Sequence, residues 1–315
     1  MDLRQLSALL AVAETGSFSA AARQLHTVQS NVSTHVARLE KELGVVLVDR
    51  GTGLLTDEGE TVARRARQIQ AEIDALTADV ASMHDEVAGS VRLGVIGTTA
   101  RWLVPPLLVA FTERYPKVGL IVVDATTSSL LPQLVGGRLD LAVVNLPVDD
   151  PDVTTERLFD EDPTLVTPLD HPLASQDRVT LADIARYPIL LEPQGTGFRD
   201  VLDEQAAAAG ITLVPQAQID GMRLLATLAF QGFGAALLPA SAAPNWVGGD
   251  WRRVMVDGID GRSVGLARRK RGMLSVPARA LRAVIRDVID VESTSQPGVH
   301  GTIEPDPDPV RADAS

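Results

Sequence analysis

The sequence predicts an α/β protein with an all-helical amino-terminal unit, joined to the remainder by one long helix. Three observations lead to this prediction. Helical stripes of apolar residues run through residues 1–60, a regular apolar repeat follows from residue 61, and buried strand-like runs alternate with helical segments beyond residue 90. The chain has 315 residues, 45% of them hydrophobic, and this leaves enough apolar surface for two or three cores.

Two helices joined by a tight turn are predicted between Ser17 and Gly44. The second carries apolar residues at spacings of four, three and four, namely Val32, Val36, Leu39 and Leu43. A preceding helix has a stripe of Leu3, Leu6, Leu10 and Ala13 and ends at Gly16, and we expect Ser19 to cap the short helix between them. Three helices so arranged match the helix-turn-helix plan, in which the last helix enters the major groove of DNA.

The polar side of this last helix carries the candidate contacts to bases and phosphates: Gln29, Ser30, Asn31, Ser33, Thr34 and Arg38. On spacing alone, an ordinary amphipathic surface helix explains the pattern equally well. The three-helix context favours DNA reading. Residues 1–67 hold eight Lys/Arg and eight Asp/Glu, and the whole chain has a net charge of −12, so binding must depend on local placement of charge.

These residues also resemble a known family. The run from Phe18 through AAARQLH, VQSNVS, RLEKELG and Arg50, followed by LTDEG at 55–59, is similar to the amino-terminal domain of LysR-type transcriptional regulators. The resemblance implies a winged helix-turn-helix domain over residues 1–60, with Gln29, Ser30, Ser33 and Thr34 at the groove-facing start of the recognition helix and Arg50 as a further contact. Residues 49–55 are shorter than the usual wing and lack its second arginine, and Thr34 stands where an arginine is frequent.

A linker helix with a coiled-coil seam is predicted over residues 61–90. Its apolar residues alternate spacings of four and three, the a/d pattern of a two-chain seam: Val62, Ala66, Ile69, Ile73, Leu76, Val80, Met83 and Val87. A helix lying on its own domain is the alternative. Dimerisation explains a single narrow stripe better, and it lets two recognition helices read two half-sites.

Residues beyond Gly89 and Ser90 read as strands alternating with helices, the signature of a sheet with crossover helices. By resemblance, this region is an effector-binding domain of two α/β subdomains, related in architecture to periplasmic solute-binding proteins. We assign residues 91–162 and 266–290 to the first subdomain and residues 163–265 to the second. Residues 291–315, rich in proline and acidic side chains, are expected to form a disordered tail.

The candidate effector site consists of polar or small residues where strands end and helices begin, together with two residues able to pack on an organic ligand: Thr98, Thr99, Ser128, Ser129, Asn145, Gly195, Thr196, Phe198 and Met222. Hydroxyls beside free helix amides suit a carboxylate or another small anion. Ordinary helix capping is the alternative for the Ser and Thr residues. Arg101 can either neutralise an anion or extend into solvent.

Several other classes of site are not predicted. The chain has no cysteine, and its five histidines form no metal-binding spacing, so we expect neither metal nor cofactor. The common nucleophile-elbow, phosphate-loop and dinucleotide motifs of enzymes are missing. No secretion signal or membrane-length apolar run is recognised, so a cytoplasmic protein is expected. The run ARRKRG at 267–272 is interpreted as a solvated edge of charged residues.

The hypothesis that follows is a ligand-responsive transcription factor, not an enzyme. Its expected partners are double-stranded operator DNA, a small-molecule effector and further copies of itself, in a dimer or a tetramer. The alternative is a ligand-binding sensor whose amino-terminal helices mediate protein assembly and read no DNA.

Overall fold

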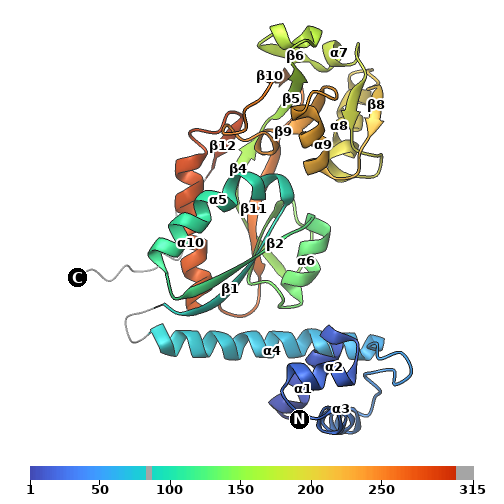
Figure 1. Ribbon diagram of the computed structural model, residues 1–315, viewed down its shortest axis with the longest axis vertical. Coiled ribbons are helices and arrows are strands. Elements are labelled where there is room, and N and C mark those ends of the chain that lie inside the picture. Colours follow the sequence, from blue (N-terminus) through green and yellow to red (C-terminus); the bar gives the residue numbers. More distant parts are fainter. Residues whose placement is uncertain (83–86, 303–315) are drawn as a thin grey trace, which may run out of the picture.

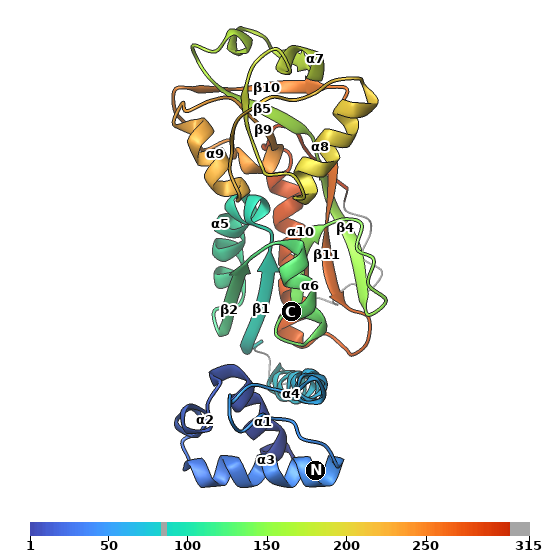
Figure 2. The same cartoon turned by 90° about the vertical axis from the view of Figure 1, so that its right-hand side faces the viewer.

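A computed structural model describes residues 1–82 and 87–302. Figure 1 shows a helical unit at one end, the long helix α4 (Asp57–Ser82) beside it, and two α/β subdomains stacked beyond α4. Figure 2, turned by 90°, shows α4 end-on between the helical unit and the first of these subdomains. The linker helix therefore lies where the two functional halves of the chain meet.

The amino-terminal unit contains α1 (Leu3–Thr15), α2 (Phe18–Gln24) and α3 (Gln29–Leu43). Asp2 and Gln5 form a capping box at the start of α1, and Gly16 ends it with a left-handed φ of 65°. The Ser17 side chain accepts from the Ala20 amide, so Ser17, and not Ser19 as expected, caps α2. Helix periodicity alone locates the start of a short helix only to within a residue or two, and the expected cap was therefore misplaced.

The core of this unit is formed by part of the predicted stripes. On α1, Leu6 and Leu10 are buried, whereas Leu3 is 50% exposed and Ala13 is half-buried. Val32, Val36 and Leu39 are at most 1% exposed, whereas Leu43, on the last turn of α3, is 41% exposed. The wing is short: a single antiparallel bridge joins Val48 to Leu55. This core fixes α3 against α1 and α2 with its opposite face directed away from them.

The residues of the predicted seam lie in different environments along α4. Ala66 is buried in the core of the amino-terminal unit and Val62 packs against it. Ile69, Leu76 and Val80 are exposed by 40%, 66% and 53%. The exposed part of the seam is thus shorter than expected, because its first two residues, Val62 and Ala66, pack against the amino-terminal unit of the same chain.

The end of the predicted linker also differs from expectation. Val87 lies beyond the end of the helix, and its side chain packs against the core of the first α/β subdomain. Met83 lies outside the described residues. The side of α4 that faces away from the amino-terminal unit contacts the first α/β subdomain, where Gln68 Nε2 donates to the Val135 carbonyl at 3.0 Å. Part of α4 therefore lies on the first α/β subdomain of its own chain, the arrangement weighed above as the alternative to a two-chain seam.

The first subdomain has a six-stranded sheet in the order β12-β4-β11-β3-β1-β2. Its strands are β1 (Gly89–Val95), β2 (Val118–Asp124), β3 (Leu141–Asn145), β4 (Val153–Glu161), β11 (Arg262–Arg269) and β12 (Val299–Gly301). Strands β1, β2 and β3 are parallel, as the strand-helix alternation predicts. Helices α5 (Gly97–Arg114), α6 (Thr127–Val135) and α10 (Val276–Glu292) pack against it.

The second subdomain has a six-stranded sheet in the order β6-β10-β5-β9-β7-β8. Its strands are β5 (Pro163–Pro168), β6 (Arg178–Thr180), β7 (Ile189–Leu191), β8 (Pro215–Gln218), β9 (Ala236–Pro239) and β10 (Trp251–Asp257). Helices α7 (Leu181–Ile184), α8 (Gly197–Ala208) and α9 (Met222–Phe230) and the short 3₁₀ helices η1 (Pro172–Ser175) and η2 (Ala240–Ala242) complete it. The chain passes between the subdomains at β4–β5 and again at β10–β11.

Two predicted boundaries are wrong. Strand β11 begins at Arg262 and pairs with β3 and β4, so the return to the first subdomain comes four residues before residue 266. The expected disordered tail from 291 is partly folded: α10 continues to Glu292, and β12 adds an edge strand beside β4. Val299 of that strand is 5% exposed, so burial of an apolar side chain outweighs the polar composition around it.

Candidate nucleic-acid interface and effector pocket

The first turn of α3 is open to solvent. Gln29, Ser30, Asn31, Thr34 and Arg38 are exposed, and Ser33 is half-buried. Val28, at the start of the helix, provides no side-chain cap; of the first amides, that of Asn31 donates to the Val28 carbonyl at 3.0 Å. Unsatisfied amides at a helix amino terminus carry partial positive charge and suit a phosphate oxygen. Gln29, Ser30, Asn31, Ser33 and Thr34 thus lie together near the accessible start of α3, whereas Arg38 lies further along the helix.

Some of these residues already have intramolecular partners. Asn31 Nδ2 donates to Thr27 Oγ1 at 2.9 Å, and Thr34 Oγ1 donates to the Ser30 carbonyl at 2.7 Å. Both contacts are exposed single hydrogen bonds, so exchanging them for contacts to DNA costs little.

Arg50 is held more firmly. Its guanidinium donates to Ser33 Oγ at 3.1 Å and to Glu40 Oε2 at 2.8 Å, and it lies 4.8 Å from the centre of the Phe18 ring. Glu40 in turn accepts from the Leu47 and Val48 amides that lead into the wing. Arg50 therefore ties the wing to α3, in addition to its predicted role at DNA.

A cavity of about 200 Å³ lies between the two subdomains. Strand ends from the first subdomain and the start of α8 from the second form its walls. The lining residues are Asn145, Leu146, Glu161, Pro163, Gly197, Phe198, Val201, Leu202, Pro239, Asp260, Gly261 and Arg262. Of the nine predicted effector residues, Asn145 and Phe198 are among them.

A buried ion pair forms the polar end of this cavity. Arg262 Nε donates to Glu161 Oε1 at 2.7 Å, and the Glu161 side chain is fully buried. Glu161 Oε2 accepts from the Ser241 amide at 2.7 Å, while Arg262 also donates to Thr98 Oγ1 at 2.6 Å. The guanidinium is thus neutralised inside the protein, and the hydroxyl of Thr98 is occupied by it.

Asn145 supplies the free hydrogen-bonding group at this cavity. Its Oδ1 atom is buried without a hydrogen-bond partner among the described residues. An unpaired buried acceptor costs about 1–3 kcal/mol, so a ligand that donates a hydrogen bond there gains correspondingly. Thr99, fully buried beside Thr98, likewise has an Oγ1 atom without a partner in the described part of the chain.

The remaining predicted effector residues do not line this cavity. Ser128 and Ser129 are exposed and share hydrogen bonds with Thr126, as in ordinary capping turns. The Gly195 amide donates to Asp200, and Thr196 Oγ1 donates to the Pro193 carbonyl. Met222 packs against the core of the second subdomain. The predicted effector residues therefore do not form one cluster. Their positions after strand ends in the sequence do not specify the direction in which each loop turns.

A second contact closes the other side of the subdomain interface. Arg223 at the start of α9 forms an ion pair with Asp124 at the end of β2. Arg101 lies over the Phe230 ring, 5.4 Å from its centre, and burial together with nearby Arg223 lowers the pKa of its guanidinium. Arg101 thus packs on an aromatic ring, while its Nη1 atom is buried without a hydrogen-bond partner among the described residues.

Residues 1–82 and 87–302 contain no group of three or more His, Cys, Asp or Glu side chains arranged to hold a metal ion. None of their helices is both long enough and apolar enough to cross a bilayer.

An exposed recognition-type helix, a linker helix and two α/β subdomains around a cavity define a DNA-binding regulator with an effector-binding domain. Two family models match the chain: "Bacterial regulatory helix-turn-helix protein, lysR family" over residues 3–60, and "LysR substrate binding domain" over residues 84–290. The chain belongs to the LysR family of transcriptional regulators. This confirms the predicted family and fold class, and members of the family are transcriptional regulators and not enzymes.

Its relatives include proteins named for hydrogen peroxide. A probable hydrogen peroxide-inducible genes activator of Streptomyces viridosporus is 35% identical over 296 residues, covering 91% of this chain and 94% of the relative. One of Mycobacterium leprae is 36% identical over 300 residues, with the same coverage of 91% and 94%. The dual regulator OxyR of Escherichia coli is 30% identical over 246 residues, or 78% of this chain and 81% of that protein.

Solved structures agree with the fold. A full-length OxyR variant from Pseudomonas aeruginosa superposes with a TM-score of 0.76 at 25% identity, covering 97% of this chain and 99% of that one. CbnR, a LysR family regulator also solved with its target DNA, superposes with a TM-score of 0.66 at 23% identity and covers 93% of this chain and 100% of the chain in that complex.

Proposed function

We propose that the chain reads operator DNA with the first turn of α3 and adjusts this binding in response to a small molecule held between the subdomains. The observation that carries the proposal is the pairing of an uncapped, exposed α3 terminus with a cavity that both subdomains line. Gln29, Ser30, Asn31, Ser33, Thr34, Arg38 and Arg50 are the proposed DNA contacts. As a DNA-binding regulator it acts in the cytoplasm, as two copies or a tetramer.

The charges around the cavity favour an uncharged effector over the expected carboxylate. Arg262 is already paired with Glu161, and Asp260 adds a second carboxylate to the walls. An anion there meets repulsion without an uncommitted cation among the lining residues. A small molecule that donates a hydrogen bond to Asn145 Oδ1 and packs on Phe198 fits the same walls without that cost.

The relatives' names suggest hydrogen peroxide as one molecule of this class, since it is small, uncharged and a hydrogen-bond donor. Peroxide sensing by cysteine proceeds through oxidation of a thiolate to a sulfenic acid or disulfide. The 315 residues include no cysteine. If peroxide is an effector of this chain, it therefore acts by reversible binding or through another residue type.

Operator reading is tested by measuring the affinity of the purified protein for its own upstream DNA against random DNA at a stated salt concentration. The Gln29→Ala/Ser33→Ala variant should lose its preference for the upstream DNA while its melting temperature stays close to that of the parent. Lys41→Ala, on the last turn of the same helix, is the matched control and should keep the preference. No preference of the parent for the upstream DNA over random DNA would instead favour an assembly role for these helices. An equal preference in all three proteins would show that Gln29 and Ser33 do not read the operator.

The effector class is tested by a thermal-shift screen of small amides, alcohols and carboxylic acids together with hydrogen peroxide. Uncharged compounds should raise the melting temperature of the parent and of Ser128→Ala, but not of Asn145→Leu. Stabilisation by carboxylic acids alone would refute the uncharged class, and an effect lost in Ser128→Ala would move the site away from the cavity.

A further inference from the structure

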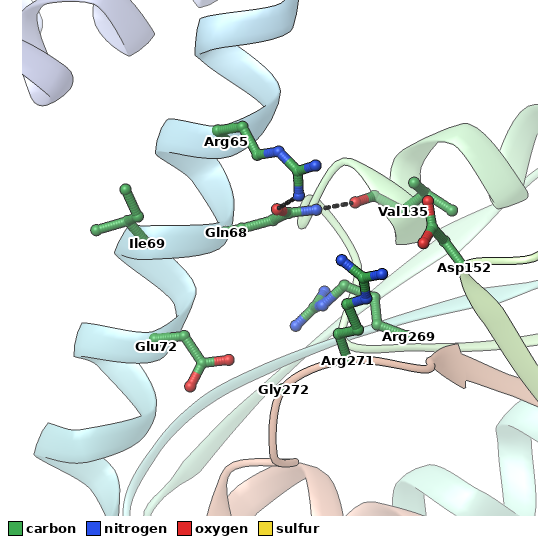
Figure 3. Close-up of a pocket in the computed structure, with 9 residues that line it drawn as sticks. All are labelled: Arg65, Gln68, Ile69, Glu72, Val135, Asp152, Arg269, Arg271 and Gly272. Carbon is green, nitrogen blue, oxygen red and sulfur yellow. Dashed lines mark hydrogen bonds between the residues drawn. The ribbon is translucent and has the colours of Figure 1, made fainter.

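A second pocket lies between the linker helix and the base of the first subdomain, and it shares no lining residue with the effector cavity. Its volume is about 270 Å³. Figure 3 shows α4 on one side and the end of β11 with the loop after it on the other. The lining residues are Arg65, Gln68, Ile69, Glu72, Val135, Asp152, Arg269, Arg271 and Gly272.

Three guanidinium groups from both walls line this pocket, and none forms a salt bridge with a carboxylate that the structure describes; Arg269 interacts with Asp140 only at longer range. Arg65, on α4, donates to Gln68 Oε1 at 3.0 Å. Arg269 Nη1 donates to the Leu134 and Leu139 carbonyls. Arg271 makes no hydrogen bond or ion pair with any residue in the described ranges. Each of the three retains N–H groups that can donate to a ligand.

Two carboxylates also line the pocket. Glu72 lies against the loop, where a Cβ atom on Gly272 would meet its Oε1 at 2.5 Å, and Asp152 belongs to the opposite wall. Neither forms a salt bridge with a residue that the structure describes. In Figure 3 the Arg65, Arg269 and Arg271 side chains extend into the space between α4 and the subdomain. The Glu72 side chain extends from α4 toward the loop at Gly272, and Asp152 lies on the subdomain side. With three guanidinium groups against two carboxylates, the pocket lining carries a net positive charge.

We propose that this pocket binds the dianionic group of a small molecule, of the phosphate or phosphomonoester type. Guanidinium groups match the oxygen geometry of phosphate and can bind it bidentately, and an anion relieves the mutual repulsion of three like charges. A water molecule occupies about 30 Å³, so the volume leaves room for an organic part beside the phosphoryl group.

Such a ligand connects the two halves of the chain. Arg65 belongs to the linker helix that packs on the amino-terminal unit, whereas Arg269 and Arg271 belong to the first subdomain. Binding therefore favours the arrangement in which α4 lies against the subdomain, because that arrangement brings the three guanidiniums to one anion. Binding at this pocket requires neither the effector cavity nor DNA, so its test is independent of the test of the proposed function.

The test is a thermal-shift titration of the full chain with inorganic phosphate and, separately, with glycerol 3-phosphate, each against chloride at equal ionic strength. Both probes should raise the melting temperature of the parent by a few degrees at saturation. Arg271→Gln and Arg65→Gln should lose this rise. Lys270→Gln is the matched control: it removes a neighbouring positive charge that does not line the pocket and should keep the rise.

The pattern across variants decides the proposal. A rise with glycerol 3-phosphate much larger than with phosphate identifies an organic phosphomonoester as the source, and equal rises identify the free ion. An equal rise in the parent and in Arg271→Gln, or no rise with either probe, overturns the proposal. Loss of the rise in Lys270→Gln as well reduces it to a general charge effect.

Discussion

At the scale of single residues, the Glu161–Arg262 pair determines the polarity of the cavity proposed to hold the effector. The two residues are direct register partners on β4 and β11, and a fully buried carboxylate here needs both the Arg262 guanidinium and the Ser241 amide. A buried pair adds little net stability compared with apolar residues, yet removing one partner is costly. The pair therefore fixes the polarity of the cavity more than it stabilises the fold.

Removing Arg262 should show this cost. Arg262→Leu leaves Glu161 as a buried charge without a counter-ion, and we expect the free energy of unfolding to fall by about 3–5 kcal/mol in denaturant titration. Glu161→Gln/Arg262→Leu should recover part of the loss, since glutamine still accepts from the Ser241 amide. Arg157→Ala, which removes the exposed Arg157–Asp160 pair, is the control, with an expected loss of about 1 kcal/mol or less. Equal losses in Arg262→Leu and Arg157→Ala would contradict the role assigned to burial.

Asp140 gives the chain a pH-dependent element of stability. Burial raises the pKa of its carboxyl group above the usual value, despite the hydrogen bond that Oδ2 accepts from the Arg92 amide. A raised pKa in the folded state means that folding favours the protonated carboxyl of Asp140 over the charged one. The stability that the protonated form gives is therefore present at low pH, and it is lost as the pH rises through the folded-state pKa.

Asp140→Asn should therefore stabilise the protein at neutral pH, because asparagine keeps an oxygen for the Arg92 amide without the buried charge. The advantage should shrink as the pH falls and Asp140 of the parent becomes protonated. Unfolding curves of both proteins across the acidic range measure it. A stability difference that does not change with pH would show that charge burial is not the cause.

At the scale of elements, sequence periodicity predicts what is local and fails where distant segments meet. The α3 stripe is predicted because Val32, Val36 and Leu39 lie on one face of one helix. Glu161 and Arg262 are missed because only the pairing of β4 with β11 brings them together. Strand β12 is missed for the same reason: its composition suggests disorder, and its ordering depends on an edge of β4 that no local pattern reveals.

The exposed part of α4 is the element on which assembly is predicted to depend. Leu76→Asp should shift the protein from dimer toward monomer in analytical ultracentrifugation, since a charge replaces an apolar seam residue that is 66% exposed in the single chain. Thr77→Asp places the same charge one residue away, off the apolar stripe, and should leave the dimer intact. If Leu76→Asp dimerises as tightly as the parent, the seam is not the interface.

At the scale of the whole molecule, the two chain crossings between the subdomains and the position of α4 suggest how a ligand signal reaches DNA. A molecule in the cavity contacts both subdomains, and it therefore favours one relative arrangement of them. The first subdomain rests on α4 through Gln68 and Val135, and α4 packs on the amino-terminal unit through Ala66. A change at the cavity can thus alter the separation of two recognition helices in a dimer.

The most direct test is a hydroxyl-radical footprint of the full chain on its own upstream DNA. Two copies joined through α4 should protect two segments whose centres are separated by a whole number of helical turns of about 10.5 base pairs, because each α3 must face the same side of the duplex. Leu76→Asp should weaken both protections together. A single protected segment that persists in Leu76→Asp would contradict the account.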